Sequence, residues 1–385
     1  MSSLREALQP LVDSQLVPGL VATVGRGDQQ EVVVLGDAAV GGPPMHEDAL
    51  FRIASITKPM MAAVVLTMVA DGTLQLDQPV DELLPELASP RVVRSLHGPT
   101  DDTVPASRAI TVRHLLTSTN GHGFPSDFSA PAMQLLVERL LQGATELQRV
   151  PAPDDWMSIL AEIPLLHQPG EGFTYNAAFD ILGVLAARAG GMALPELMAA
   201  RLFAPLGMTE TGFAFPAGSV GRRTSYYRHG DDGLVELDAA DDQAGPWSTV
   251  PPFPSGAGGL VSSLADVVAF QRMLLSGGAG ILPAQLVTAM MSDQLTPTIR
   301  NTDTAFLDGQ TWGFGGGVDI VDLRPWNVRG RYGWVGGTGT AAHVVPSDDS
   351  IAVLLTQVGL EGPTGSAVIE PFFAAAAEHL GHHPA

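Results

Sequence analysis

β-Strand patterns occur near the two ends of this chain and are separated by a long stretch of helical patterns. The N-terminal pair is predicted as a hairpin around the turn-forming residues 25–28. Strands at both ends with helices between them predict a sheet assembled from the two termini, with a mainly helical segment inserted in the chain. The predicted strands cover residues 20–24, 31–35, 313–319, 339–345 and 351–357.

Helical patterns fill residues 80–250, where no strand alternation appears. Within this stretch, residues 231–242 are acidic and are expected to form an irregular loop. We therefore expect a discontinuous α/β domain of residues 1–80 and 255–385, and a mainly helical domain of residues 81–254. The predicted helices begin near Leu4 and then cover 55–70, 112–117, 132–141, 155–163, 176–189, 194–203, 263–275 and 366–380.

The composition excludes several classes of protein. With a formal charge of −21, the chain repels phosphate groups, so we expect neither nucleic acid nor a membrane as a partner. The absence of cysteine excludes disulfides, thiolate metal sites and a cysteine nucleophile. The first residues lack the apolar core of a signal peptide. We expect a cytoplasmic protein with no metal and no cofactor, and the oligomeric state stays open.

The chain contains one lysine, Lys58, which follows Ser55 by three positions. A buried lysine can lose its proton and act as a base, whereas arginine stays charged. A serine hydroxyl needs such a base to become a nucleophile, and residues three apart in a helical turn lie on one face. We therefore interpret Ser55 and Lys58 as nucleophile and base, although a surface lysine that happens to follow a serine is the alternative.

Two further segments carry candidate chemistry. Tyr175 follows a Pro-Gly loop and precedes an apolar helix, and a tyrosine near an amine can share its proton. A buried tyrosine with a structural hydrogen bond fits this pattern equally well. Residues 332–340 are rich in glycine, and exposed backbone amides there would bind an oxyanion. An ordinary turn between two strands is the alternative for that segment.

Taken in this order, Ser55-x-x-Lys58, Tyr175 and Trp334-x-Gly336 resemble the serine β-lactamase and penicillin-binding-protein superfamily, and more narrowly its class C-like branch with the family VIII carboxylesterases. The resemblance implies an α+β fold in which helices flank an antiparallel sheet. It also implies an acyl-enzyme on Ser55, with Lys58 and Tyr175 handling protons. The oxyanion hole would be the backbone amides of Ser55 and Gly337.

Two departures from the β-lactamase pattern bear on the substrate. In β-lactamases an asparagine stands two places after the tyrosine, but here Ala177 holds that place and Asn176 comes one place early. The third motif of those enzymes usually begins with Lys or His, which binds a substrate carboxylate, whereas Trp334 begins it here. An aromatic side chain packs against an uncharged group instead. The residues predicted to bind substrate are Trp334, Val335, Gly336, Asn176 and His122.

We therefore predict a serine carboxylesterase that hydrolyses short-chain, uncharged esters, with β-lactamase activity weak or absent. Acyl transfer, transesterification and the hydrolysis of amides or D-amino-acid peptides use the same acyl-enzyme and stay open. A non-catalytic binding protein is disfavoured, because a binding module has no need for a neutralisable lysine beside a serine. No serine has glycine at both the second position before it and the second after it, so the nucleophile elbow of α/β-hydrolases is absent.

Overall fold

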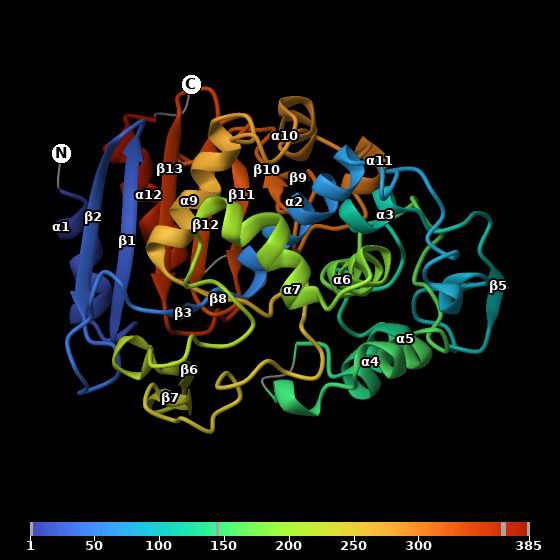
Figure 1. Ribbon diagram of the computed structural model, residues 1–385, viewed down its shortest axis with the longest axis horizontal. Helices are drawn as coiled ribbons and strands as arrows, with labels where there is room; N and C mark the ends of the chain where they lie inside the picture. Colours follow the sequence, from blue (N-terminus) through green and yellow to red (C-terminus); the bar gives the residue numbers. More distant parts are fainter. Residues whose placement is uncertain (1–2, 144–145, 363–366, 383–385) are drawn as a thin grey trace.

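One antiparallel sheet joins the two ends of the chain, as predicted. The computed structural model describes residues 3–143, 146–362 and 367–382. Its seven-stranded sheet has the order β2-β1-β13-β12-β11-β10-β9, so the N-terminal hairpin pairs with the last strand (Figure 1). The strands are β1 (Gly19–Arg26), β2 (Gln29–Gly36), β9 (Thr311–Trp312), β10 (Gly317–Val318), β11 (Tyr332–Gly336), β12 (Thr340–Val345) and β13 (Ser350–Thr356).

Helices cover both faces of this sheet (Figure 1). The first helix, α1 (Leu4–Asp13), packs against the last, α12 (Ile369–Leu380), and α12 lies against β1 and β13. On the other face α9 (Leu264–Leu275) lies against β1, β12 and β13. Strand β1 is buried from Gly19 to Gly25, as expected for a strand with a helix on each side.

Helices also dominate residues 81–254. They are α3 (Val112–Leu116), α4 (Pro131–Leu140), α5 (Pro153–Leu160), α6 (Ala177–Gly190), α7 (Leu194–Met198) and α8 (Ala204–Leu206). One hydrophobic cluster contains Leu115 and Trp156 from this region together with Val353 of β13, so the core is continuous across the sheet and the helices. The division into two domains at residues 80 and 254 stays a prediction.

The expectation that residues 80–250 contain no strands is wrong. Two short antiparallel hairpins occur there, β4 (Arg91–Val93) with β5 (Thr103–Pro105), and β6 (Tyr226–Gly230) with β7 (Gly233–Asp238). Three-residue strands are too short to show an alternating pattern. The second hairpin is largely exposed, and its turn and second strand lie within residues 231–242, which were expected to form an irregular acidic loop.

Two smaller differences concern the C-terminal part. Of the strand predicted at 313–319, only residues 317–318 form a strand, β10, because residues 313–316 make the connection between β9 and β10. The last helix begins at Ile369, and residue 366, where it was expected to begin, lies outside the described residues.

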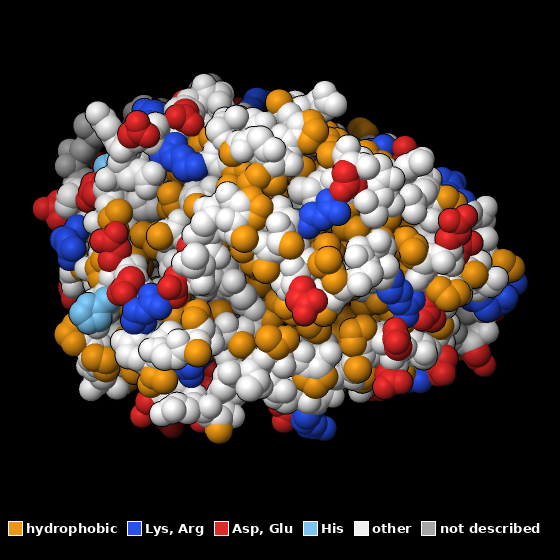
Figure 2. Space-filling view, viewed as in Figure 1, with side chains coloured by type: hydrophobic (Ala, Val, Ile, Leu, Met, Phe, Trp, Pro, Cys, Tyr) orange, Lys and Arg blue, Asp and Glu red, His pale blue; other side chains and the backbone are white. Residues whose placement is uncertain are grey.

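Charged side chains are distributed in small groups over the surface. On the face shown in Figure 2, Arg side chains lie singly beside Asp and Glu side chains. Arg188, for example, pairs with Glu86 and with Asp154. Among the described residues, no single helix is long and apolar enough to cross a bilayer, although the bent pair Ala177–Gly190 and Leu194–Leu206 meets both criteria together.

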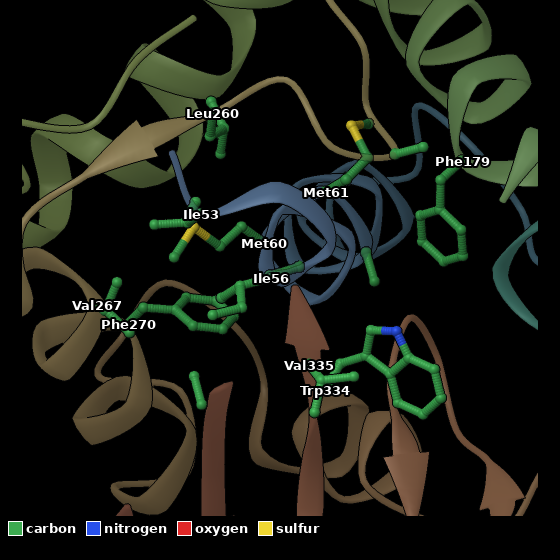
Figure 3. Packing of buried hydrophobic residues seen from close by; sticks show 14 of the residues in the cluster. Ile53, Ile56, Met60, Met61, Phe179, Leu260, Val267, Phe270, Trp334 and Val335 are labelled. Atoms are coloured by element: carbon green, nitrogen blue, oxygen red, sulfur yellow. The ribbon is translucent and has the colours of Figure 1, made fainter. Parts of the chain in front are cut away.

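Strand β11 ends at the beginning of helix α2 (Thr57–Ala70), as Figure 3 shows. The two meet closely at Gly336, where an added Cβ would clash with the carbonyl oxygen of Ile53 and with the side chain of Thr340. At the next residue, Gly337, a Cβ would meet nothing within 4 Å, and its backbone angle is one that other residues adopt. The lack of a side chain at Gly336 therefore lets the sheet approach the segment that carries Ser55.

This contact predicts different effects of alanine at the two neighbouring glycines. Gly336→Ala should lower the free energy of unfolding by about 2 kcal/mol or more. The added methyl group would clash with the Ile53 backbone and with Thr340 of the neighbouring strand, and the packing of the sheet holds both in place. Gly337→Ala is the matched control and should change it by no more than about 0.5 kcal/mol. Chemical denaturation of both variants measures the difference, and equal stabilities would contradict the close approach.

Candidate active site

Ser55 and Lys58 meet where a short 3₁₀ turn, Ala54–Ile56, leads into α2. The Lys58 Nζ lies 2.8 Å from the Ser55 Oγ, which is the contact that their spacing predicted. Ser55 is half-buried, whereas the Lys58 side chain is fully buried. Ala54 has a φ of +44°, an unfavourable backbone conformation for a residue with a side chain, directly before the candidate nucleophile.

Two oxygens besides the Ser55 hydroxyl contact the Lys58 amine. The Asn176 Oδ1 lies 2.9 Å from the Nζ, and the Ala257 carbonyl oxygen lies 2.7 Å from it. Both are pure acceptors, so a neutral amine donates its two protons to them. Its lone pair then points at the Ser55 hydroxyl, which is the direction that proton abstraction requires.

Burial of Lys58 favours the neutral form of its amine. Desolvation lowers the pKa of Lys58 to about 7, and the buried carboxylate of Asp180 opposes this shift. At neutral pH a large fraction of the lysine is therefore unprotonated, as a general base must be.

Asn176 reaches Lys58 although it stands one place earlier than the β-lactamase asparagine. Its backbone has a φ of +83°, which is rare for a residue other than glycine. This conformation turns the side chain toward Lys58, and the Asn176 Nδ2 donates to the Oε1 of Gln142 at 2.7 Å. Asn176 therefore makes the lysine contact although Ala177 holds the place of the β-lactamase asparagine, and its spacing from Tyr175 did not predict this contact.

Tyr175 sits in an aromatic cluster beside the lysine. Its ring stacks on Phe306, with centroids 4.3 Å apart, and the Lys58 Nζ lies 4.4 Å from the ring centroid. Burial raises the pKa of Tyr175 to about 12, against the opposing effect of hydrogen bonds from Ser55 and Trp334. The phenol is therefore protonated at neutral pH and can serve as an acid, while Lys58 serves as the base.

Trp334 does not occupy the place that was predicted for it. Its side chain is 2% exposed, and its Nε1 donates to the Tyr175 hydroxyl at 2.6 Å. Because the tryptophan only donates, the Tyr175 hydroxyl accepts from it and keeps its own proton for another acceptor. The aromatic residue of the third motif orients the tyrosine, whereas it was predicted to pack against the substrate.

A cavity of about 550 Å³ opens beside Ser55. Ser55, Gly337 and Thr338 line it on one side, and Asn176, Gln142 and Asp180 on another. Apolar side chains form much of the remaining wall, among them Leu140, Leu147, Val150, Leu237, Trp247 and Phe253. The amides of Ser55 and Gly337 thus border one cavity, and their role as an oxyanion hole stays a prediction.

The cavity offers no free basic side chain among its described lining residues. Arg52 is the one basic residue in the lining, and its guanidinium forms a buried ion pair with Asp238 and donates to the Thr224 carbonyl oxygen. Besides Arg52 and Asp238, the charged residues that line the cavity are Glu146 and Asp180, and both are acidic. A substrate carboxylate would therefore find no unpaired cation among the described lining residues. Within the described parts of the chain, no cluster of three or more ligating side chains could hold a metal ion.

The other predicted substrate-binding residues lie elsewhere. His122 is buried, its Nε2 contacts the Ile163 carbonyl oxygen, and it is absent from the cavity lining. Val335 and Trp334 line a small separate cavity of about 50 Å³, and Gly336 contacts the backbone before Ser55. Sequence reasoning missed Gln142 and Asp180, whose signal, two polar residues beside apolar helices, is too common to single them out.

The indole N–H of Trp334 should matter for the reactivity of Ser55. Trp334→Phe keeps an aromatic ring but removes the donor to Tyr175, and the rate at which a fluorophosphonate labels Ser55 should fall roughly tenfold. Trp312→Phe is the matched control, because Trp312 packs against the same tyrosine ring while its Nε1 has no hydrogen-bond partner among the described residues. Equal labelling rates in the two variants would show that the hydrogen bond has no role.

Comparisons with known proteins agree with this geometry. The profile of the Beta-lactamase family matches residues 4–368. Protein Rv1367c of Mycobacterium tuberculosis is 33% identical over 91% of this chain and 88% of its own length. Esterase EstB of Burkholderia gladioli is 31% identical over 94% of this chain and 91% of its own length.

Solved structures show the same fold. EstCE1, described as a hydrolase with promiscuous acyltransferase activity, superimposes with a TM-score of 0.80 at 23% identity, over 97% of both chains. Unliganded simvastatin synthase (LovD) of Aspergillus terreus, as its selenomethionyl derivative, gives 0.79 at 23% identity, over 98% of this chain and 96% of the other. This chain therefore belongs to the beta-lactamase family, as a serine hydrolase within the serine β-lactamase and penicillin-binding-protein superfamily.

Proposed function

We propose that this protein hydrolyses uncharged carboxylic esters with short acyl chains through a covalent acyl-enzyme on Ser55. The observation that carries the proposal is the contact of 2.8 Å between the Ser55 hydroxyl and a fully buried lysine whose other two partners are pure acceptors. The resemblance to Esterase EstB supports an ester substrate.

Acylation begins when the Ser55 Oγ attacks the ester carbonyl carbon and its proton passes to Lys58. The amides of Ser55 and Gly337 hold the negative oxygen of the tetrahedral intermediate. Tyr175 then gives its proton to the leaving alkoxide as the ester C–O bond breaks. The alcohol departs, and the acyl group stays on Ser55.

Deacylation restores every proton to its starting place. Water gives a proton to the Tyr175 phenolate and attacks the acyl carbon. The bond between that carbon and the Ser55 Oγ breaks, and Lys58 returns its proton to the serine. The carboxylic acid leaves a site that is ready for the next ester.

The lining of the cavity favours an uncharged substrate. Its single basic side chain, Arg52, is already paired with Asp238, and two further carboxylates face the same space. A β-lactam carries a carboxylate that this wall repels, so turnover of β-lactams should be negligible beside that of esters.

Acyl transfer to an alcohol is the second candidate, and the size of the cavity favours it. A volume of about 550 Å³ leaves room for an acceptor after a short acyl group has bound to Ser55. Several relatives bear acyltransferase names, such as monacolin J acid methylbutanoyltransferase of Aspergillus terreus, which is 26% identical over 79% of this chain. Product analysis with an added alcohol separates transfer from hydrolysis, since only transfer yields a new ester.

Substitutions of the two central residues test the proposal. Ser55→Ala should abolish fluorophosphonate labelling and lower kcat/KM for nitrophenyl esters by at least about a thousandfold. Lys58→Arg should be nearly as damaging as Lys58→Ala, because arginine keeps the charge but does not act as a base. The esters should span increasing acyl chain lengths, with a chromogenic cephalosporin assayed beside them.

Each assay has an outcome that would contradict the proposal. Full ester turnover in Ser55→Ala would exclude this nucleophile, and an active Lys58→Arg enzyme would mean that the lysine acts only through its charge. Efficient hydrolysis of the cephalosporin would show that the acidic lining does not select against anions. Rates of nitrophenyl ester hydrolysis that rise with acyl chain length would contradict the proposed preference for short acyl chains.

A further inference from the structure

A buried carboxylate, Asp180, lies behind the lysine in the first turn of α6 and contacts neither Ser55 nor Lys58 directly through a hydrogen bond. The residue is 3% exposed, and its carboxylate accepts from the Gln142 Nε2 at 2.7 Å, the Ser255 Oγ at 2.6 Å and the Ala257 amide at 3.2 Å. Burying a carboxylate without a cation in contact is costly, so its hydrogen bonds must hold it there.

One of these hydrogen bonds determines how the Asn176 side chain is oriented. A carboxylate only accepts, so the Gln142 amide must turn its NH₂ group toward Asp180. Its oxygen then faces away and accepts from the Asn176 Nδ2 at 2.7 Å. The Asn176 oxygen is left on the side of Lys58, where it accepts at 2.9 Å. The direction of both amides thus follows from the charge of Asp180.

A second path from Asp180 reaches the other acceptor of the lysine. The Ser255 hydroxyl gives its proton to Asp180, and its oxygen accepts from the Gly258 amide at 3.1 Å. The Gly258 N–H and the Ala257 carbonyl belong to the same planar peptide unit. Holding the N–H on Ser255 therefore directs the carbonyl toward Lys58, which it meets at 2.7 Å.

We propose that Asp180 is a positioning residue that fixes both oxygen acceptors of Lys58 and so directs the lone pair of the amine at Ser55. The inference rests on the proposed function, in which Lys58 is the base. A merely structural role, in which Asp180 ties α6 to residues 255–258 and to the end of α4, is the alternative that an experiment must separate from it.

The charge of Asp180 also acts on the lysine. Among the described residues, Asp180 is the ionisable group whose charge raises the pKa of Lys58, against the larger effect of burial. The other titratable group against the amine is Tyr175, which contributes a ring face and stays neutral. Burial raises the pKa of Asp180, and the hydrogen bonds from Gln142, Ser255 and the Ala257 amide, together with the charge of Lys58, oppose that shift and favour the carboxylate. Removing the carboxylate should therefore lower the pKa of the lysine as well as release its acceptors.

Three variants separate positioning from structure. Asp180→Asn removes the charge at constant shape, and Gln142→Met removes the link to Asn176 while Asp180 keeps its charge. Asp266→Asn is the matched control, since Asp266 is likewise a buried carboxylate in the first turn of a helix, α9, and accepts from the Glu210 amide and the Thr211 hydroxyl. The rate of fluorophosphonate labelling of Ser55 and kcat/KM for a nitrophenyl ester are measured from pH 5 to 10, and thermal unfolding is followed in parallel.

In Asp180→Asn the acid limb of both profiles should move to lower pH by about one unit or more, and the plateau should fall roughly tenfold. Gln142→Met should lower the plateau to a similar extent, with a much smaller shift of the acid limb. Asp266→Asn should lower the melting temperature and leave both profiles unchanged.

Wild-type profiles in Asp180→Asn and Gln142→Met, with ester turnover intact, would overturn this inference and leave the proposed function standing. If Asp180→Asn does not fold, the plateau of Gln142→Met decides between the two roles. Absence of both labelling and ester turnover in the wild-type protein would overturn the proposed function, and this inference with it.

Discussion

The hydrogen-bonding of one amine governs the chemistry of this molecule. Lys58 is surrounded by two oxygens that only accept and one hydroxyl that can also donate. A neutral amine fits this environment in one way, with its lone pair on Ser55. Burial favours the neutral form, so the same packing that hides the lysine also turns it into a base. The fold brings the sheet, α2, α6 and the 255–258 segment together at this point.

The aromatic cluster extends the same directionality beyond the serine. Trp334 donates to Tyr175, which leaves the tyrosine proton free for another acceptor. The Tyr175 hydroxyl is therefore oriented by the sheet, while the Ser55 hydroxyl lies against Lys58. This arrangement explains why a tryptophan can stand where other enzymes of this fold place a cation. The indole N–H of Trp334 orients the hydroxyl of Tyr175, which is the acid. The site consequently lacks, at this position, the cation that would bind a substrate carboxylate.

Much of the fold and the central pair of the site could be predicted from the sequence, because they depend on local patterns. Apolar runs near both termini predicted the shared sheet, and a spacing of three residues predicted the contact of Ser55 with Lys58. The hairpin β6–β7 was not predicted, because acidic residues surround its second strand and its apolar side chains, Val235 and Leu237, are exposed. The contact of Asn176 with Lys58 depends on one positive φ, and the direction of the Trp334 indole depends on packing between distant segments. His122 was placed in the site because of its position in a loop, but it is buried against Ile163.

The most direct test of this account is a titration of the lysine itself. Because Lys58 is the only lysine in the chain, protein grown with lysine labelled with ¹³C at Cε gives one side-chain NMR signal, and Lys58→Arg provides the blank. The account predicts that the chemical shift of this signal titrates with a midpoint near pH 7. A midpoint near the ordinary lysine value of 10.5 would contradict it, because the amine would then be protonated at neutral pH and unable to act as the base.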